Sequence, residues 1–484
     1  MTDSSFSIRR RNALGWMSAA SLGAGLVTPA WRARAAASGA PVKLPEPSRS
    51  DYDVIVIGAG FAGVTAAREL SRAGLSTLVV EARNRVGGRT FTSQWMDEQI
   101  ELGGTWIHWT QPHVFAEVSR YGLSLKESPG ALPDAVTWIA AGKAHTAKSG
   151  KIMPELAELL ARYCNVDGAQ GRALVPFGYD ILANQAALAA WDHLSLQDRL
   201  AQMKLTRIQQ DLLSPILTID CHNDPALAGF VSQLHWWALG DYDFGRMFDK
   251  LGRFKIKEGM NALSAAILGD AHAELALTSP VRSVRQEAGK VTVVTGNGTT
   301  YGARAAVLAV PMNVLGDIQF SPSLSQVKLD MAKARHAGNG VKGYVRIKQK
   351  IGKWFGQAPF PNPITMAWTE DEREDGTTIV VFGPPGQLDL TDEESVQNAV
   401  RQLLPKAEIV AATGYQWSQD PYAKGTWCFY RPMQVTRGLQ GMQADEGALF
   451  FATSDIANGW RGFVDGAIET GLTAARHARA YLNV

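Results

Sequence analysis

Three glycines follow an apolar run near the start of the chain at the spacing Gly-x-Gly-x-x-Gly. They are Gly58, Gly60 and Gly63, with Phe61 and Ala62 between the last two. In such a loop the first glycine permits a tight turn, the second lets the backbone approach a pyrophosphate, and the third lets a helix pack closely. A helix that begins here offers free N–H groups and a positive dipole end to phosphates. The pattern therefore predicts a dinucleotide-binding loop.

A carboxylate stands where the ribose of a dinucleotide would lie. Glu81 follows Gly63 by 18 positions and ends the apolar run from Leu75. At the end of a second strand, such a carboxylate can accept hydrogen bonds from ribose hydroxyls. The apolar run 52–57, the helical spacing of 62–73 and the run 75–81 together predict a β-α-β unit.

The segment Glu81-Ala82-Arg83-Asn84-Arg85-Val86-Gly87-Gly88-Arg89-Thr90 comes directly after this unit. It resembles the motif that members of the flavin-containing amine oxidase family, which includes the monoamine oxidases, carry at this place. The resemblance implies FAD as the cofactor. The paired glycines allow close approach of the backbone, and Arg83 and Arg89 can supply charge-assisted hydrogen bonds to a pyrophosphate.

The resemblance extends over essentially all of residues 51–484 and implies further contacts to FAD. It places residues 101–106 along the isoalloxazine and Val281 at the adenine. A helix that begins at Val464 would point its positive end at flavin N1 and the C2 carbonyl. Asp455 stands where the family commonly has glutamate, and its shorter carboxylate can reach a ribityl group or a phosphate-bridging water. The cofactor-binding residues so predicted are Gly58, Gly60, Phe61, Ala62, Gly63, Glu81, Ala82, Arg83, Gly88, Arg89, Thr90, Gly104, Thr105, Trp106, Val281, Asp455 and Val464.

Three residues match positions that carry the chemistry of the family. Lys342 corresponds to a lysine that holds a water near flavin N5. Trp427 and Phe463 correspond to two aromatic rings that form a cage for the amine in front of the flavin. Taken alone, a lysine on a strand such as Lys342 is usually exposed, and the alternative for Trp427 and Phe463 is an ordinary place in the core. Thr426 stands where some members have a cysteine that attaches the flavin, so the FAD is expected to be non-covalent.

Within the family, the sequence most resembles the bacterial amine oxidases of nicotine breakdown, on the segments 106–114 and 458–460 together with Trp427. This implies a small pyridyl amine, oxidised at its α-carbon to an imine that is hydrolysed to an aldehyde and an amine. Phe463, in place of a polar residue, favours pseudooxynicotine over nicotine. The electrons would pass to dioxygen or to a redox protein.

Other interpretations stay open. Apart from Phe463, the sequence does not discriminate against a nicotine oxidase. An L-amino acid oxidase shares the FAD motifs but would need an arginine to bind a carboxylate. A non-catalytic flavoprotein would use FAD only as a structural core. The candidates for the arginine are Arg246, Arg253 and Arg431. The aromatic residues that either line the pocket or belong to the core are His235, Trp236, Trp237, Tyr242, Phe244 and Trp368.

The predicted fold class is α/β, with a Rossmann-like FAD-binding domain and an α+β substrate domain. Periodicity predicts mostly helix between residues 130 and 252, and a last helix over 464–482. Strands are predicted over 276–284, 290–295, 305–310, 340–347 and 378–382. The discontinuous FAD-binding domain is assigned to 51–130, 253–330 and 425–484, and the substrate domain to 131–252 and 331–424.

The first 35 residues differ in composition from the rest. Arg9, Arg10 and Arg11 precede a weakly apolar stretch, and Ala33-Arg34-Ala35 has the small-x-small pattern of a cleavage site. Residues 1–35 are therefore predicted to be an export signal of the twin-arginine type, and 36–50 a linker. The expected location is the periplasm, or the cytoplasm if the signal is not used.

Composition limits the partners. The 48 Lys and Arg residues nearly balance the 46 Asp and Glu residues, without a long basic run, so no nucleic acid is expected. The nine histidines and three cysteines are scattered, so no metal is expected either. No stretch reads as an integral membrane segment. A small-molecule amine is the expected partner, and a homodimer is allowed.

Overall fold

The computed structural model describes residues 44–484 of the chain. The predicted export signal, residues 1–35, and the first part of the predicted linker lie outside this range. Within residues 44–484, no helix combines the length and the apolar character needed to cross a membrane.

The larger sheet of the described chain has eight strands in the order β10-β2-β1-β13-β12-β11-β14, and β20 also pairs with β13. At its centre, β1 runs parallel to both β2 and β13, which is the arrangement that a β-α-β unit requires. Its strands are β1 (Asp51–Ile57), β2 (Thr77–Val80), β10 (Glu274–Ala276), β11 (Val281–Glu287), β12 (Lys290–Thr295), β13 (Thr300–Leu308), β14 (Gln319–Ser321) and β20 (Leu449–Phe451).

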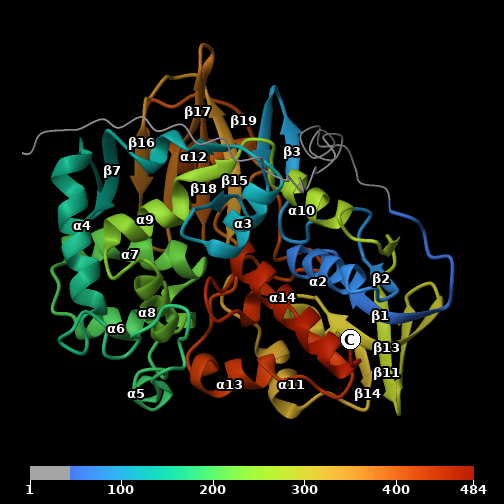
Figure 1. Cartoon of the computed structure of the whole chain (residues 1–484). Coiled ribbons are helices and arrows are strands. Elements are labelled where there is room, and N and C mark those ends of the chain that lie inside the picture. Colours follow the sequence, from blue (N-terminus) through green and yellow to red (C-terminus); the bar gives the residue numbers. More distant parts are fainter. Residues whose placement is uncertain (1–43) are drawn as a thin grey trace, which may run out of the picture.

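Two long helices from opposite ends of the chain lie side by side on this sheet. They are α2 (Phe61–Arg72) and α14 (Val464–Tyr481), which Figure 1 shows in blue and red. A Cβ on Gly471 of α14 would collide with the carbonyl oxygen of Ala62, so this glycine permits the close approach. The predicted helices 62–73 and 464–482 are thus confirmed to within a residue or two, and both begin at the same side of the sheet.

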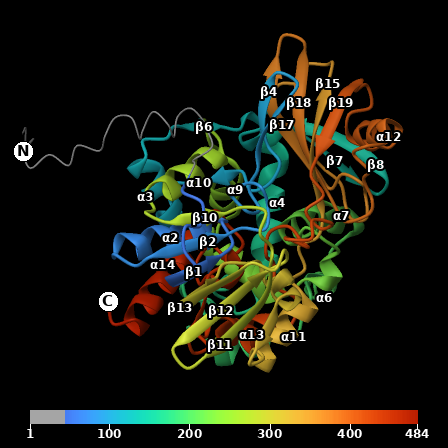
Figure 2. The same ribbon diagram turned by 90° about the vertical axis from the view of Figure 1, so that its right-hand side faces the viewer.

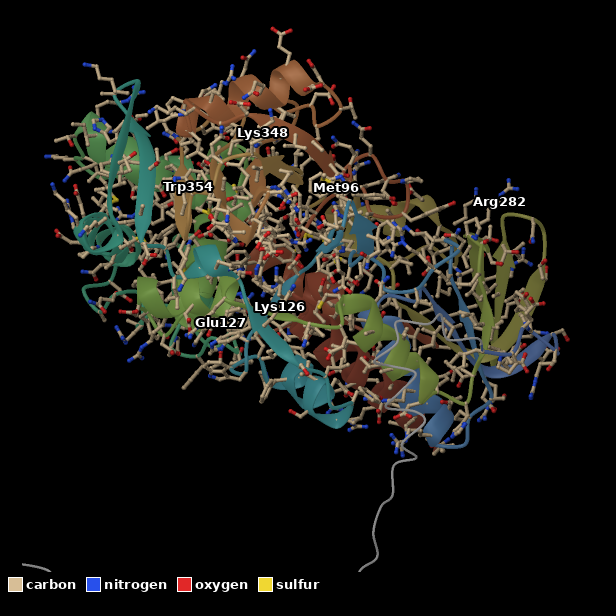
Figure 3. The ribbon with its side chains drawn as sticks, turned by 90° about the horizontal axis from the view of Figure 1, so that it is seen from above. Met96, Lys126, Glu127, Arg282, Lys348 and Trp354 are labelled. Atoms are coloured by element: carbon tan, nitrogen blue, oxygen red, sulfur yellow. The ribbon has the colours of Figure 1, made fainter. Side chains whose placement is uncertain are left out.

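The second sheet of the described chain has seven strands in the order β19-β15-β18-β17-β16-β7-β8. Figure 2 shows it at the opposite side of the molecule from β11, β12 and β13. In Figure 3, Trp354 of this sheet and Arg282 of the larger sheet lie toward opposite ends of the molecule. The strands are β7 (Ala135–Ala140), β8 (Lys143–Lys148), β15 (Val341–Ile347), β16 (Trp354–Gln357), β17 (Met366–Arg373), β18 (Gly376–Gly383) and β19 (Ile409–Gly414).

Helices fill most of the chain between residues 149 and 252, as predicted. The prediction was wrong for 135–148, which form the hairpin β7–β8. Strand β7 pairs in parallel with β16, more than two hundred residues later, and such non-local pairing leaves no local signal. The helices are α4 (Ser149–Cys164), α5 (Gln185–Ala189), α6 (Leu196–Gln202), α7 (Arg207–Cys221), α8 (Phe230–Leu239) and α9 (Phe244–Gly252).

The predicted strands over 290–295, 305–310, 340–347 and 378–382 correspond to β12, β13, β15 and β18. The single strand predicted over 276–284 was wrong, because β10 ends at Ala276 and β11 begins at Val281. Thr278, between them, has a φ of 53°, which no extended strand allows. The turn carries the chain from one edge of the sheet toward the other.

The two sheets are formed by different ranges of the chain. The strands of the larger sheet all fall in the ranges assigned to the FAD-binding domain, and those of the second sheet in the substrate ranges. The domain boundaries themselves stay a prediction. The remaining helices and strands are β3 (Thr92–Trp95), β4 (Glu98–Glu101), β5 (Trp106–Ile107), α3 (Pro112–Arg120), β6 (Leu125–Glu127), β9 (Phe254–Ile256), α10 (Met260–Gly269), α11 (Gln326–Ala334), α12 (Glu393–Leu403) and α13 (Gln434–Gln443).

Candidate active site

A cavity of about 480 Å³ is lined by residues of both sheets and of the helices α7, α8 and α9. Two predicted residues, Gly63 and Asp455, are not in its lining. The predicted residues that line the cavity are Gly58, Gly60, Phe61, Ala62, Glu81, Ala82, Arg83, Gly88, Arg89, Thr90, Gly104, Thr105, Trp106, Val281, Lys342, Trp427, Phe463 and Val464.

The glycine loop forms a cradle that side chains would fill. Gly58 has a φ of 104°, and a Cβ on it would lie 2.5 Å from the carbonyl oxygen of Ala309. A Cβ on Gly88 would lie 3.1 Å from the Cα of Gly60, so the two loops meet at their glycines. A Cβ on Gly63 would collide with the carbonyl oxygen of Gly58, so this third glycine lets α2 pack on the loop. The cradle fits the close approach of a pyrophosphate.

Glu81 lies at the edge of this cradle. Its carboxylate accepts hydrogen bonds from the N–H of Ala59 at 2.7 Å and from the N–H of Arg83 at 2.8 Å. These bonds fix the carboxylate beside the loop at the end of β2, where a ribose hydroxyl would meet it. The ribose contact itself stays a prediction.

Both predicted pyrophosphate arginines are paired with carboxylates. Arg83 donates to Asp420 at 2.5 Å, and Arg89 donates to Asp455 at 2.6 Å. Burial alone would raise the pKa of Asp455, but the Arg89 charge holds it below its usual value. Asp455 also accepts from the N–H of Met312 at 2.9 Å. It thus acts behind the cavity wall, orienting Arg89, and its contact to FAD stays a prediction.

Lys342, on β15, points its ammonium group at the segment predicted to run along the isoalloxazine. It donates to the carbonyl oxygens of Glu101 at 2.7 Å and Gly103 at 2.8 Å, and to the hydroxyl of Thr105 at 2.5 Å. Burial lowers the pKa of Lys342 well below its usual value, against the opposing charges of Glu370 and Glu101. A lysine with a lowered pKa can exchange a proton near neutral pH. The water that the family resemblance places between Lys342 and flavin N5 stays a prediction.

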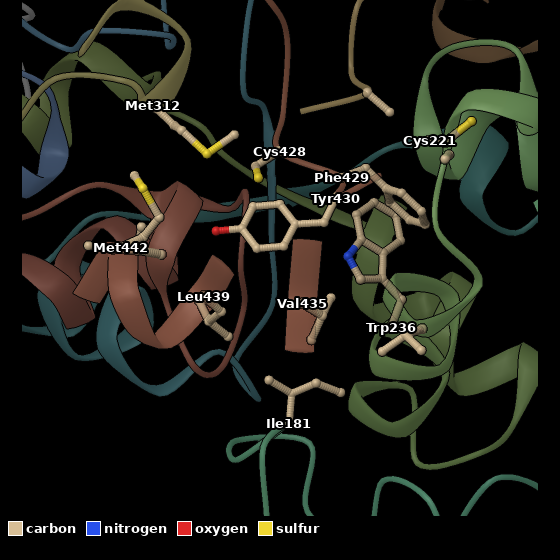
Figure 4. Packing of buried hydrophobic residues seen from close by; sticks show 14 of the residues in the cluster. Ile181, Cys221, Trp236, Met312, Cys428, Phe429, Tyr430, Val435, Leu439 and Met442 are labelled. Carbon is tan, nitrogen blue, oxygen red and sulfur yellow. The ribbon is translucent and has the colours of Figure 1, made fainter. Parts of the chain in front are cut away.

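The two predicted cage residues line the other half of the cavity. The ring of Trp427 stacks on His222 with centroids 4.1 Å apart, and that of Phe463 contacts Trp236 at 5.1 Å. Figure 4 shows Trp236 packed beside Phe429, in a cluster that fixes its indole. Each cage ring is therefore held from behind by another aromatic side chain.

His222 is a site residue that the sequence did not reveal. It has a left-handed φ of 50° at the end of α7. Its Nε2 lies 3.1 Å from the carbonyl oxygen of Val341, which can only accept, so Nδ1 must accept from the Thr426 hydroxyl at 3.0 Å. Burial lowers the pKa of His222 to about 3. The ring under Trp427 is thus neutral.

The surroundings of Thr426 bear on the prediction that FAD is bound without a covalent bond. The Thr426 hydroxyl is bonded to His222, and none of the three cysteines lines the cavity. Cys428 is buried, with its Sγ toward the carbonyl oxygen of Asp455 at 3.7 Å. This geometry agrees with a flavin held without a covalent bond.

Several lining residues lie on elements far apart in the sequence. Trp236, Phe244 and Trp368, which the sequence left between pocket and core, line the cavity. Their neighbours His235 and Trp237 instead bond to loop carbonyls, at Gly178 and Gln170. The further apolar walls are Ile216, Ile219, Met247, Phe248, Leu251, Met366 and Phe382. The local signals for them were the helical spacing of Ile216 and Ile219 on α7 and of Met247, Phe248 and Leu251 on α9.

The three arginines considered for a substrate carboxylate do not line the cavity. Arg253 pairs with Glu127 and Asp249, and Arg246 lies within 3.8 Å of the exposed Asp241. Arg431 donates to backbone carbonyl oxygens. The geometry thus disfavours an amino acid as the substrate.

Comparison with known proteins identifies the family. The family model described as flavin containing amine oxidoreductase matches residues 61–479. The chain belongs to this family. It is 43% identical to the pseudooxynicotine dehydrogenase of a Pseudomonas species, over 90% of this chain and 88% of the relative. It is 32% identical to the nicotine dehydrogenase of Pseudomonas putida, over 90% of this chain and 89% of that one.

A solved structure supports the fold. Wild-type putrescine oxidase bound to putrescine superposes with a TM-score of 0.76, at 23% identity, over 89% of this chain and 99% of that chain. The predicted family, the α/β fold with a second sheet, the FAD cofactor and the amine oxidase activity are thus confirmed. The residues of the cradle fit the cofactor that the family uses.

The glycine cradle gives a first prediction. In Gly58→Ala, the added Cβ meets Ala309 and the φ of 104° is strained. Strain of about 1–3 kcal/mol should weaken FAD binding by about fivefold or more, measured as flavin absorbance per protein and by titration of the apoprotein. Gly74→Ala is the control, since Gly74 has a φ of 85° but nothing within 4 Å of its added Cβ. Equal FAD retention in both variants would contradict the cradle.

Proposed function

We propose that the protein oxidises a small pyridyl amine in nicotine catabolism, with pseudooxynicotine as the substrate. The observation that carries this proposal is the aromatic half of the cavity, which Trp427 and Phe463 line and which none of Arg246, Arg253 and Arg431 reaches. The relative at 43% identity, a pseudooxynicotine dehydrogenase, supports the same substrate. Nicotine is the second candidate, because the relative at 32% is a nicotine dehydrogenase.

The chain's own residues position the reaction. When bound, FAD supplies the two-electron acceptor. The faces of Trp427 and Phe463 confine the amine so that its α-carbon faces the flavin, and the apolar walls exclude water. The start of α14 at Val464 adds a positive dipole end at the cavity wall, which favours negative charge there. Catalysis would rest on the positioning of the amine and on the electrostatic field of the α14 dipole at this wall.

The proposed products follow from the chemistry of the amine. Loss of a hydride equivalent from the α-carbon of the neutral amine gives a protonated imine, and water hydrolyses it to an aldehyde and methylammonium. The electrons leave to dioxygen or to a redox protein, and a protein acceptor is supported by the two relatives, both of which are dehydrogenases. A homodimer also stays a prediction, which light scattering of the purified protein would test.

Anaerobic mixing tests the substrate. The purified yellow protein would be mixed with pseudooxynicotine, nicotine, simple methylamines and L-amino acids while absorbance near roughly 450 nm is followed. We expect the fastest loss of flavin absorbance with pseudooxynicotine. Faster bleaching by nicotine would favour the second candidate. Bleaching by amino acids alone, or by none of the compounds, would contradict the proposal.

We also propose that residues 1–35 direct export to the periplasm by the twin-arginine route. Support comes from Arg9, Arg10 and Arg11 ahead of the apolar stretch, and from the small-x-small pattern at 33–35. Replacing the three arginines by lysine keeps the charge but removes the arginine pair. In a bacterial host, we expect the full-length protein in the periplasmic fraction and the variant in the cytoplasm. Equal distribution of both would contradict export by this route.

A further inference from the structure

A single carboxyl group lies among the apolar walls of the substrate half of the cavity. It belongs to Asp220, on α7, which lines the cavity and is 5% exposed. Its Oδ2 accepts a hydrogen bond from the side-chain amide of Gln233 at 2.7 Å. Within the described chain, its Oδ1 has no hydrogen-bond partner. One carboxylate oxygen thus remains free for a ligand.

Among the described residues, no positively charged side chain forms an ion pair with Asp220. Arg199 of α6 acts on the nearby Tyr163 and Cys164, but it donates to the backbone carbonyl oxygens of Tyr163 and Arg162. Tyr163 and Cys164 of α4 and Cys221 of α7 are close enough for its charge to act on them, and burial raises the pKa of each, so they are neutral at pH 7. His222, the next residue but one, is also neutral. Burial raises the pKa of Asp220 to about 7, and the bond from Gln233 opposes this rise. The carboxylate therefore lacks a cation.

The position of Asp220 relates it to the aromatic cage. Its backbone carbonyl accepts a hydrogen bond from the indole N–H of Trp427 at 2.9 Å. The cavity wall near it is formed by Ile216 and Ile219 of the same helix, together with Trp236. Aromatic faces and a carboxylate both attract cations, and a buried carboxylate gains most from one. A cationic ligand in the cavity would therefore supply the positive charge that Asp220 lacks.

We propose that Asp220 binds the ammonium group of the substrate and accepts its proton before oxidation. This inference rests on the proposed function, because an alkylamine is mainly an ammonium ion at neutral pH while its neutral form is the one oxidised. In this step an N–H bond of the ammonium breaks and an O–H bond forms at Asp220. The nitrogen keeps the electron pair, so a neutral amine and a neutral carboxylic acid result.

A structural alternative exists within the same pair of residues. The Oε1 atom of Gln233 is buried without a partner. If its amide turned over, a protonated Asp220 could donate to it, and the pair would then only join α7 to α8. This alternative needs no charge on Asp220, so the two roles differ in their response to a cationic ligand.

Equilibrium binding to the FAD-loaded enzyme tests the proposal without turnover. The probes are benzyltrimethylammonium, a permanent cation that the cavity cannot deprotonate, and N,N-dimethylbenzamide, which is neutral. Asp220→Asn keeps the shape of the side chain and an acceptor for Gln233. It should weaken the binding of the cation by about tenfold or more, while the affinity for the neutral probe changes by less than about twofold. Asp220→Glu should restore the preference for the cation. Asp211→Asn is the control, because Asp211 lies on the same helix and outside the cavity lining.

The pH dependence gives a second readout. Because its pKa is raised, Asp220 becomes ionised only as the pH rises through about 7. The wild type should therefore bind the permanent cation more tightly at pH 8 than at pH 6, and Asp220→Asn should reduce this difference. Lys342 also titrates in the cavity, and since it is present in both proteins their comparison isolates Asp220.

The outcomes are distinct. If Asp220→Asn binds both probes as the wild type does, while amines still bleach the wild-type flavin, the inference about Asp220 is wrong and the proposed function stands. If Asp220→Asn loses affinity for both probes equally, and Asp220→Glu does not recover it, Asp220 has the structural role and the inference is overturned. If no amine bleaches the wild type, the proposed function fails first.

Discussion

The ion pair between Arg89 and Asp455 is the constraint on which the cavity depends. Asp455 is fully buried, and a buried carboxylate is stable only with a cation and hydrogen-bond donors around it. Arg89 supplies the charge and also donates to the carbonyl oxygen of Thr426 and the hydroxyl of Ser454. Met312 supplies a backbone N–H. Four segments from distant parts of the chain are thereby fixed around one charge.

From this pair the cavity extends in two directions of opposite character. Toward the larger sheet lie the glycine cradle and the N-termini of α2 and α14, which favour anionic groups. Toward the second sheet lie aromatic and aliphatic walls, a neutral His222 and the carboxyl of Asp220. Lys342 stands at the boundary, bonded to the 101–105 segment. A dinucleotide and a small cationic amine therefore find complementary surroundings in one cavity.

The sequence was most informative where a turn, a strand end or a helix is determined by residues close together in the chain. The turn at Gly58 and Gly60, the strand end at Glu81 and the helix from Val464 each follow from spacing and residue type. The family resemblance added Lys342, Trp427 and Phe463, and all three line the cavity. The hairpin β7–β8 and the residues His222 and Asp220 were missed. Their places depend on pairing with β16, on a left-handed turn and on packing between helices, and these leave no periodic signal.

A crystal structure of the FAD-loaded protein with a non-oxidisable pyridyl trimethylammonium analogue of pseudooxynicotine tests the central claim most directly. That claim is that one cavity holds the pyrophosphate of FAD at the glycine cradle and the amine between Trp427 and Phe463. We predict the flavin ring at the 103–106 segment, with the ammonium group between the two aromatic rings. An analogue bound outside the cavity, or a flavin ring that fills the space between Trp427 and Phe463, would contradict the account.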